Sequence, residues 1–546
     1  MINKISVQNY KAFKNASIEL KPITIFLGAN SVGKSSIMKL LLLITQNANS
    51  TDPLKSALKI NGETIQLGSF ENIIHKKDLK SNLRITFHLT KFNILKYKNQ
   101  ILNQIFDRYE ALKKTYYMQK KGVDDFEVIS SDIRKDIINF KKEKKLPIEQ
   151  IFKEMMSYQI KINNILKKSE KKSLEARIAS IFLQDYSEYN KSNGIHFDLS
   201  NYKSLLYYLI KLDNHKTNTF TILYEFSLNN KKMITINKFA IYSEESVNIF
   251  SYELQGRKHI ISSIYFEKNI GKKYSTKFAK SISFNQFQVT RIQNSDNNIL
   301  INTIIKMISD FVKTIKDTFN YENINYVDPL RAYPRRYYFL DEKDMLTSLN
   351  KIDGEQMATM LKENNDLKFK VNKWIGKFNL NVDIEQLQDT IHNIKISQNG
   401  LSLDITDVGF GISQILPIIT QGFFSKNNST TLIEQPEIHL HPKMQSELAD
   451  LFIDIIHNSN SEININKRII IETHSEYLLK RLRRRIADTT VLNKDIAIYS
   501  FELEKESNIG IINKIIIQEK GAFDWPKDFY STDMDDTIEF LKYQDK

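Results

Sequence analysis

The chain has 546 residues, of which 41% are hydrophobic, and it contains no cysteine. That length suffices for two or three domains with their own cores, and the lack of cysteine excludes disulfides, thiolate-bound zinc and cysteine nucleophiles. The net charge of +14 favours contact with nucleic acid, although a genome-wide bias towards lysine explains it equally well. We see no secretory signal and no run of about 18 apolar residues, so we expect a cytoplasmic protein without membrane segments.

The predicted elements fall into three regions. From 1 to 89, strand-like runs surround one helix, Lys34–Gln46; the runs are Ile5–Tyr10, Ala16–Leu20, Ile23–Leu27, Thr64–Leu67 and Leu83–Leu89. From 90 to 320, helical spacing dominates and no catalytic motif appears. The predicted helical segments are Ile101–Tyr116, Ile133–Lys145, Ile148–Lys168 and Ile299–Phe319. The predicted strand-like segments are Phe220–Leu228 and Ile260–Phe266. From 321 to 546 the alternation of strands and helices returns.

Motif-rich regions therefore flank a long region without motifs. We expect one α/β nucleotide-binding head, split in sequence into 1–89 and 321–546 by a mixed, largely helical insertion at 90–320. An independent middle domain is the alternative. The helical segments do not sustain heptads, so no long coiled coil is predicted.

The strongest motif is a complete GxxxxGK[ST] pattern between the strand ending at Leu27 and the following helix. Its residues, with the serine after them, are Gly28, Ala29, Asn30, Ser31, Val32, Gly33, Lys34, Ser35 and Ser36. Such a loop surrounds phosphates with backbone N–H groups at a helix N-terminus. Lys34 is expected to reach the β- and γ-phosphates of ATP, and the Ser35 hydroxyl to ligate Mg²⁺. Because we expect the loop to face solvent, Lys34→Ala should abolish binding and leave the fold intact.

Acidic residues follow a second apolar strand, Thr430–Glu434. A phosphate loop needs an acid at the end of a neighbouring strand, and Glu434 is the candidate on the metal side. Glu437 is close enough in sequence to act as the base that polarises the attacking water. A strand that ends in a carboxylate is common, so this assignment depends on the phosphate loop.

Two further segments are candidates for nucleotide contacts. The strand Arg468–Ile471 leads into Glu472-Thr-His-Ser475, where His474 is placed to sense a γ-phosphate, although a capping histidine has the same pattern. A glycine-rich turn enters the helix Ile415–Gln421, and its N-terminus could bind an anion. The residues of that turn are Gly409, Gly411, Ser413 and Gln414.

Together these motifs resemble the ABC/SMC-type P-loop ATPase heads of the OLD-like group, in the expected order along the chain. Softer similarities are Gly62–Phe70 with Gln66, which looks like a Q-loop, Asp328–Arg331, and the segment Phe523–Phe529. The chain looks most like the PtuA-like ATPase subunits of Septu and retron-associated antiphage defence systems. The resemblance covers both flanking regions and leaves about 90–320 unmatched.

The resemblance implies a homodimer or a higher even oligomer with ATP and Mg²⁺ between protomers. Ser413 and Gly411 of one protomer are then expected to contact the γ-phosphate bound to the other, and Gln66 to couple the site to the insertion. The family partner is an HNH nuclease, and nucleic acid or a retron ribonucleoprotein is a further candidate partner. The chain departs at Gln435, where ABC heads have a catalytic glutamate. Either Glu437 replaces that base or hydrolysis is slow.

Three other functions are alternatives to a nucleotide-dependent regulator of a nuclease. An OLD-type nuclease needs a metal-binding Asp-x-Asp pair, and its only candidate, Asp533 and Asp535, is predicted to be a solvated turn. A clamp that binds duplex DNA could use the basic run Lys480–Arg485, which is otherwise a solvated helix face. A small-molecule kinase is the third alternative. Such kinases need neither a signature in trans nor a long insertion, so these two features of the chain argue against it.

Overall fold

The structure is a computed structural model of the chain. The described residues are 1–50, 56–121, 131, 135, 138–139, 148–168, 202–213, 217–256, 258–266, 278, 282–283, 287, 290–291, 299–329, 331, 333–339, 354–388, 391–457, 467–504, 506–526 and 531–544. The chain divides into two compact units. The first contains Met1–His88, Tyr224–Thr235 and Thr314–Lys546, and the second contains Leu89–Leu223 and Ile236–Lys313.

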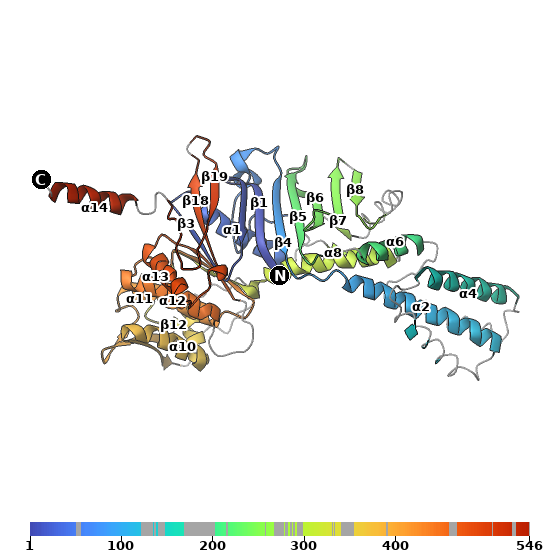
Figure 1. Cartoon of the computed structure of the whole chain (residues 1–546). Helices are drawn as coiled ribbons and strands as arrows, with labels where there is room; N and C mark the ends of the chain where they lie inside the picture. The colour runs from blue at the N-terminus through green and yellow to red at the C-terminus, as the bar shows by residue number, and fades with distance from the viewer. Residues whose placement is uncertain are drawn as a thin grey trace. The chain divides into compact units, whose positions relative to one another are not determined.

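A six-stranded sheet forms the centre of the first unit (Figure 1). In spatial order its strands are β11 (Ile324–Val327), β16 (Thr430–Glu434), β17 (Arg468–Glu472), β3 (Ile23–Gly28), β18 (Ile496–Leu503) and β19 (Gly510–Ile515). The first five are parallel and β19 is antiparallel to β18. Strands buried on both faces carry continuous apolar runs, which explains the buried sequences TTLIE and RIIIE. The carboxyl ends of β16, β17 and β3 therefore meet at one edge.

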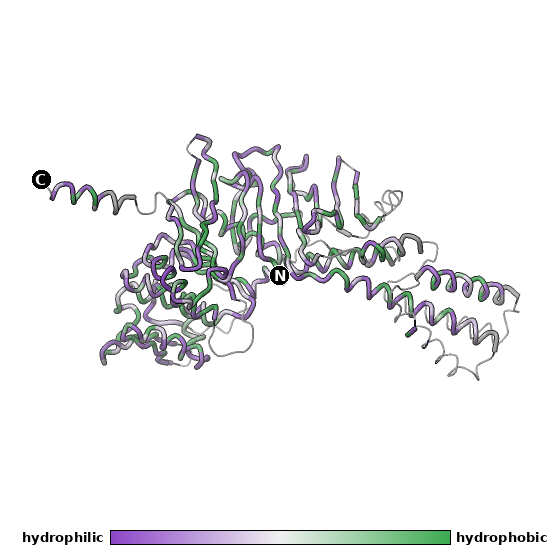
Figure 2. Tube along the Cα trace, viewed as in Figure 1, coloured by the Kyte–Doolittle hydropathy of each residue, from purple (hydrophilic) through white to green (hydrophobic). Residues whose placement is uncertain are grey.

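Helices pack on this sheet either directly or through other helices. They are α1 (Lys34–Asn49), α9 (Gly354–Glu363), α10 (Asn365–Ile375), α11 (Phe410–Phe424), α12 (Pro442–His457) and α13 (Glu476–Ala487). One hydrophobic cluster joins the strands to most of them, with Ile25, Ile433, Ile471, Leu416 and Leu451 fully buried. Figure 2 shows hydrophobic residues along the central strands and hydrophilic ones at the surrounding turns.

Two smaller groups of strands complete the first unit. β1 (Ile2–Tyr10) lies between β2 (Phe13–Glu19) and β4 (Leu83–Leu89). A four-stranded sheet follows further along the chain and consists of β12 (Tyr338–Phe339), β13 (Leu380–Gln388), β14 (Ile391–Gln398) and β15 (Leu401–Asp404). The last described helix is α14 (Ser531–Gln544). It includes Asp533 and Asp535, so the turn predicted for this pair is wrong.

The second unit combines long helices with antiparallel strands. Its helices are α2 (Lys96–Lys121), α4 (Ile148–Lys168), α6 (Tyr202–Asp213) and most of α8 (Ile299–Thr318). β7 (Asn248–Gln255) pairs with β6 (Ile234–Ser243) and β8 (Lys258–Ser262), while β9 (Ile282–Ser283) pairs with β10 (Thr290–Arg291). The chain passes between the units within β6 and within β5 (Phe220–Leu228). Buried Tyr97 donates to Asp310 at 2.7 Å and thus joins α2 to α8.

Most predicted elements exist, with a few differences. Thr64–Leu67 is not a strand, because only an isolated bridge joins Asn61 to Gln66. β8 ends at Ser262, so the strand expected through Phe266 is wrong in its second half. The predicted helix Ile133–Lys145 lies largely outside the described residues. The α/β class is confirmed. Within the part that the structure describes, no helix has the length and apolar character needed to cross a membrane.

Candidate functional site

The phosphate loop joins β3 to α1 and depends on two glycines in the left-handed region. Gly28 has φ of 138°, and a Cβ there would collide with the carbonyl of Phe501. Gly33 has φ of 106°, and its Cβ would meet the ring of Phe13. Only glycine fits both constraints. The loop therefore delivers Lys34 to the first position of α1, at the carboxyl edge of the sheet.

Lys34 is buried, with 3% of its surface exposed, whereas Ala29, Asn30 and Ser31 of the same loop are exposed, as expected. Its Nζ donates to the carbonyls of Gly28 and Ala29 at 2.9 and 2.7 Å. It also lies 3.8 Å from Glu472 Oε1. Burial lowers the pKa of Lys34, and the charges of Glu472 and Glu437 oppose that shift. The ammonium group thus stabilises the loop from inside in this structure.

Glu472 is the acid that sequence reasoning missed. The Ser35 hydroxyl donates to both of its carboxylate oxygens, at 3.1 and 2.9 Å. Glu472 ends β17, between β16 and β3, so its carboxylate reaches the first turn of α1. It ends a buried strand in the same way as Glu434, so the sequence pattern made both residues candidates.

Glu434 belongs to the same site but has a different partner. Tyr326 donates its hydroxyl to Glu434 Oε1 at 2.9 Å from the edge strand β11. Burial, and then the charge of Glu472, raise the pKa of Glu434 to about 7. Burial also raises the pKa of Glu472, against the opposing effects of Ser35 and Lys34. Two carboxylates thus share one buried region with a serine hydroxyl.

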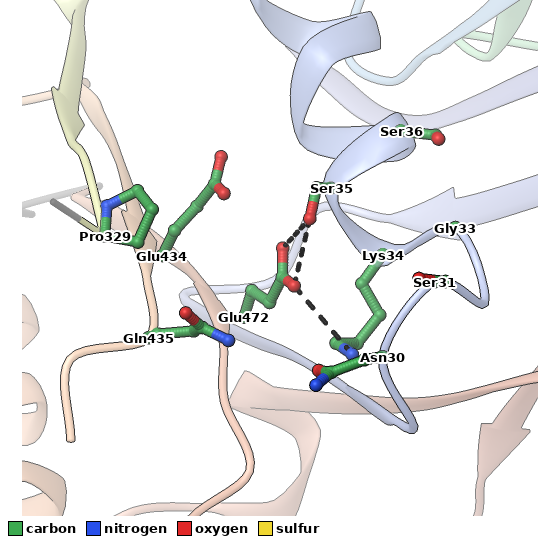
Figure 3. A pocket seen from close by; sticks show the side chains of 10 residues that line it. All are labelled: Asn30, Ser31, Gly33, Lys34, Ser35, Ser36, Pro329, Glu434, Gln435 and Glu472. Carbon is green, nitrogen blue, oxygen red and sulfur yellow. Dashed lines mark hydrogen bonds and ion pairs between the residues drawn. The ribbon is translucent and has the colours of Figure 1, made fainter. Parts of the chain in front are cut away.

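A cavity of about 270 Å³ lies between the loop and these strand ends. Its lining residues are Asn30, Ser31, Gly33, Lys34, Ser35, Ser36, Pro329, Glu434, Gln435 and Glu472. Figure 3 shows Lys34, Ser35 and Glu472 meeting on one side, with Glu434 and Gln435 across from them. All but Pro329 and Glu472 were predicted site residues. Of the other loop residues, Gly28 and Ala29 contribute carbonyls to Lys34, and Val32 is buried.

Glu437 and His474 are brought together, but outside the cavity lining. Glu437 accepts hydrogen bonds from the Thr473 hydroxyl at 2.7 Å and from the His474 backbone N–H at 2.6 Å. Burial raises the pKa of Glu437, while these bonds and the charge of Arg331 oppose the shift. The His474 side chain is exposed. Both oxygens of the proposed base therefore bind the turn after β17.

The glycine-rich turn begins α11, with Gly409 as its exposed N-terminal cap. Gly411 packs against the His439 carbonyl so closely that a Cβ would lie 2.8 Å from the oxygen. Ser413 and Gln414 are buried, with 4% and 2% exposed. None of these residues lines the cavity. The contact in trans stays a prediction.

Gln66 is exposed in the segment between Ile60 and Gly68 and does not line the cavity. The glutamine that anchors this segment is Gln46 on α1. Its side chain accepts from Ile65 N at 3.1 Å and donates to Lys59 O at 2.9 Å. Sequence reasoning did not single out this residue.

The residues present fit a shared magnesium site and not a site made by protein alone. Among the described residues, no group of three His, Cys, Asp or Glu side chains could hold a metal ion. Mg²⁺ typically takes one or two protein oxygens and completes its shell with water and phosphate oxygens. Ser35 with Glu472, and Glu434 beside them, supply such oxygens at the cavity.

The model of the AAA ATPase domain family matches residues 1–479. No curated protein matches the chain. Among solved structures, an SMC head bound to the C-terminal winged-helix domain of ScpA has 9% identity, covers 95% of this chain and 98% of its own, and has a TM-score of 0.33. The SMC head domain of Thermotoga maritima has 7% identity, covers 94% and 99%, and has the same TM-score. These structural likenesses are weak, but the family match spans most of the sequence. The chain belongs to the AAA ATPase domain family.

Proposed function

We propose that the chain binds ATP with Mg²⁺ in the cavity of Figure 3 and hydrolyses it slowly. One observation carries this proposal. A buried lysine and a serine hydroxyl at the N-terminus of α1 converge on one cavity with two carboxylates, which end β16 and β17. Phosphate loops bind nucleotides with this set of groups. Ser35, Glu472 and Glu434 would hold Mg²⁺, and the bound ion would neutralise part of the phosphate charge.

Slow hydrolysis is proposed because, among the described residues that line the cavity, the two carboxylates are assigned to Mg²⁺ and Gln435 occupies the position of the base. Gln435 lines the cavity, and an amide does not accept a proton usefully. Glu437 is the nearest alternative, but its carboxylate binds Thr473 and His474. If Glu437 is to activate water, it must first release these donors. We propose that this rearrangement limits turnover.

We further propose that ATP joins two heads through the N-terminus of α11, as the resemblance to ABC/SMC-type heads implies. Gly409 is exposed at the start of that helix, so backbone N–H groups there can approach a phosphate of the partner. The buried hydroxyl of Ser413 needs to be uncovered first. The resemblance to PtuA-like subunits is the basis for the finer proposal that this dimer restrains or positions an HNH-type nuclease in antiphage defence.

A direct DNA clamp is less well supported, because the basic run on α13 is largely paired internally. Arg481 and Arg485 bind Asp450 on α12, each at 2.5 Å. Arg483 donates to the Gly521 carbonyl and lies over the rings of Phe523 and Trp525. Lys480 pairs with Glu476 at 3.2 Å. The charges of Arg481, Arg485 and Lys480, which are paired with carboxylates in this way, contribute little to binding phosphates.

The test is ATP turnover and molecular mass of the purified protein, with and without ATP and Mg²⁺, beside Ser35→Ala and Glu437→Gln. We expect Mg²⁺-dependent ATP binding, slow turnover and a mass twice that of the monomer when ATP is bound. Ser35→Ala should weaken the Mg²⁺ dependence, and Glu437→Gln should abolish the remaining turnover. A wild-type protein that binds no ATP would contradict the proposal.

A further inference from the structure

The turn that follows β16 has an unusual backbone. Gln435 adopts φ of 46°, in the left-handed region that a glutamine rarely enters. Its N–H donates to the Glu472 carbonyl at 2.7 Å. The Gln435 carbonyl accepts a long hydrogen bond from the Ile438 N–H at 3.4 Å, so it and the Glu434 carbonyl are open to a further donor. The group that supplies these further bonds holds Gln435, which stands where ABC heads have a catalytic glutamate.

Arg331 supplies them. Its Nη2 donates to the Glu434 carbonyl at 3.1 Å and to the Gln435 carbonyl at 3.2 Å. Its Nε and Nη1 are buried and have no hydrogen-bond partner among the described residues. Burying a guanidinium group with unpaired N–H donors costs free energy. A side chain kept there despite this cost is expected to have a role.

The charges around Arg331 connect it to the same turn. Burial lowers the pKa of Arg331 to about 10, and Glu437 and Asp328 oppose that shift. Arg331 follows β11 through Pro329, which lines the cavity. One arginine from the edge of the sheet therefore contacts the backbone of the turn and lies within electrostatic range of Glu437, but it does not line the cavity.

We propose that Arg331 is a positioning residue, which holds the Glu434–Gln435 turn so that the Gln435 side chain faces the cavity and orients the attacking water. This inference rests on the proposed ATPase function. Arginine suits the role because its longer side chain and rigid, planar guanidinium group fix Nη2 between the two adjacent carbonyls, whereas lysine is shorter and its ammonium group rotates freely.

The experiment compares Arg331→Met and Arg331→Lys with Arg336→Met, an exposed arginine paired with Asp407 at 3.1 Å. In the absence of nucleotide, hydrogen exchange should accelerate in the peptide that spans 434–440 in Arg331→Met and stay unchanged in the control. ATP affinity should stay within about threefold of the wild type, while single-turnover hydrolysis falls roughly 30-fold. Arg331→Lys should give an intermediate rate.

A double-mutant cycle with Gln435→Ala then separates positioning from general damage. If Arg331 acts through Gln435, the double variant is about as slow as the slower single variant. Additive losses, or unchanged exchange of the 434–440 peptide, would overturn the inference. The Lys34→Ala variant and the wild-type affinity test the proposed function separately, and the exchange readout decides on Arg331 even if the wild type does not hydrolyse ATP.

Discussion

The phosphate loop and the basic face of α13 are two cationic regions of the same unit, and their positive charges have different kinds of partner. On α13, Arg481 and Arg485 share Asp450, so a dense basic run is neutralised within the fold. In the loop, the single Lys34 is held by two carbonyls, and its only ion partner among the described residues is Glu472 at 3.8 Å.

This difference shows that the number of basic residues in a run does not predict where anions bind. A strong ion pair with good geometry stabilises the fold but leaves no charge for a ligand. A lysine held mainly by neutral carbonyls can exchange them for phosphate oxygens with a gain in Coulomb energy. The four predictions below separate these cases.

The largest expected effect is that of Lys34→Ala on nucleotide binding. We expect ATP affinity to fall at least about 100-fold, because charge-assisted bonds to the phosphates are lost. Calorimetric titration with ATP and Mg²⁺ measures this. Since Lys34 also binds Gly28 and Ala29, thermal unfolding should show a small loss of stability. The control is Lys39→Ala, an exposed lysine on the same helix. Equal losses in both variants would contradict the assignment.

Next in size is Asp450→Asn, which leaves Arg481 and Arg485 without their shared carboxylate. Asp450 is 8% exposed, so we expect a loss of roughly 2–3 kcal/mol in the free energy of unfolding. Chemical denaturation measures it, and ATP affinity should be unchanged. Glu476→Gln, which breaks the exposed pair with Lys480, should cost under about 0.5 kcal/mol. Similar values for both variants would show that the α12–α13 pairs are unimportant.

Glu434→Gln should make the nucleotide-free protein more stable above pH 7. The pKa of Glu434 is raised to about 7, so the folded state binds more protons than the unfolded state between about pH 4.5 and 7. The contribution of this group therefore stabilises the fold at low pH and is lost as pH rises through 7. The amide still accepts from Tyr326. We expect a gain of on the order of 2 kcal/mol at pH 8 and none at pH 4, measured by unfolding at each pH.

The smallest effect is expected on nucleic acid. Replacing Arg481 and Arg485 by methionine should change the affinity for duplex DNA less than about twofold, since both side chains are already paired. Salt titrations of binding, with Lys231→Met/Lys232→Met as a control of equal charge change, measure this. A steep loss of DNA affinity confined to the α13 variant would support the alternative function, a clamp that binds duplex DNA.

The sequence was a good guide to the loop and to the strands that flank it. The pattern Gly28–Ser35 between an apolar strand and a helix indicates a phosphate loop in any context, because glycine and lysine have few other reasons for that spacing. The same logic found Glu434 at the end of β16. It gave no way to choose between Glu434 and Glu472, since both end buried strands and only the strand order shows that β17 lies beside β3.

Other assignments depended on contacts between residues far apart in the chain. Glu437 looked free in the sequence, but the fold places it against Thr473 and the backbone of His474. The run Lys480–Arg485 looked exposed, but α12 presents Asp450 to two of its arginines. Gln66 matched a motif, whereas the structure assigns the anchoring of that segment to Gln46.

The sequence by itself determined most local elements, the glycine-dependent loop and the α/β class, because these follow from spacing and backbone preference within short windows. The tertiary structure decided which acid meets Ser35, which lysine is buried and which carbonyls Arg331 binds. The contacts of Ser35 with Glu472 and of Arg331 with Glu434 join residues that lie 437 and 103 positions apart in the chain, so the order of the strands in the sheet sets them.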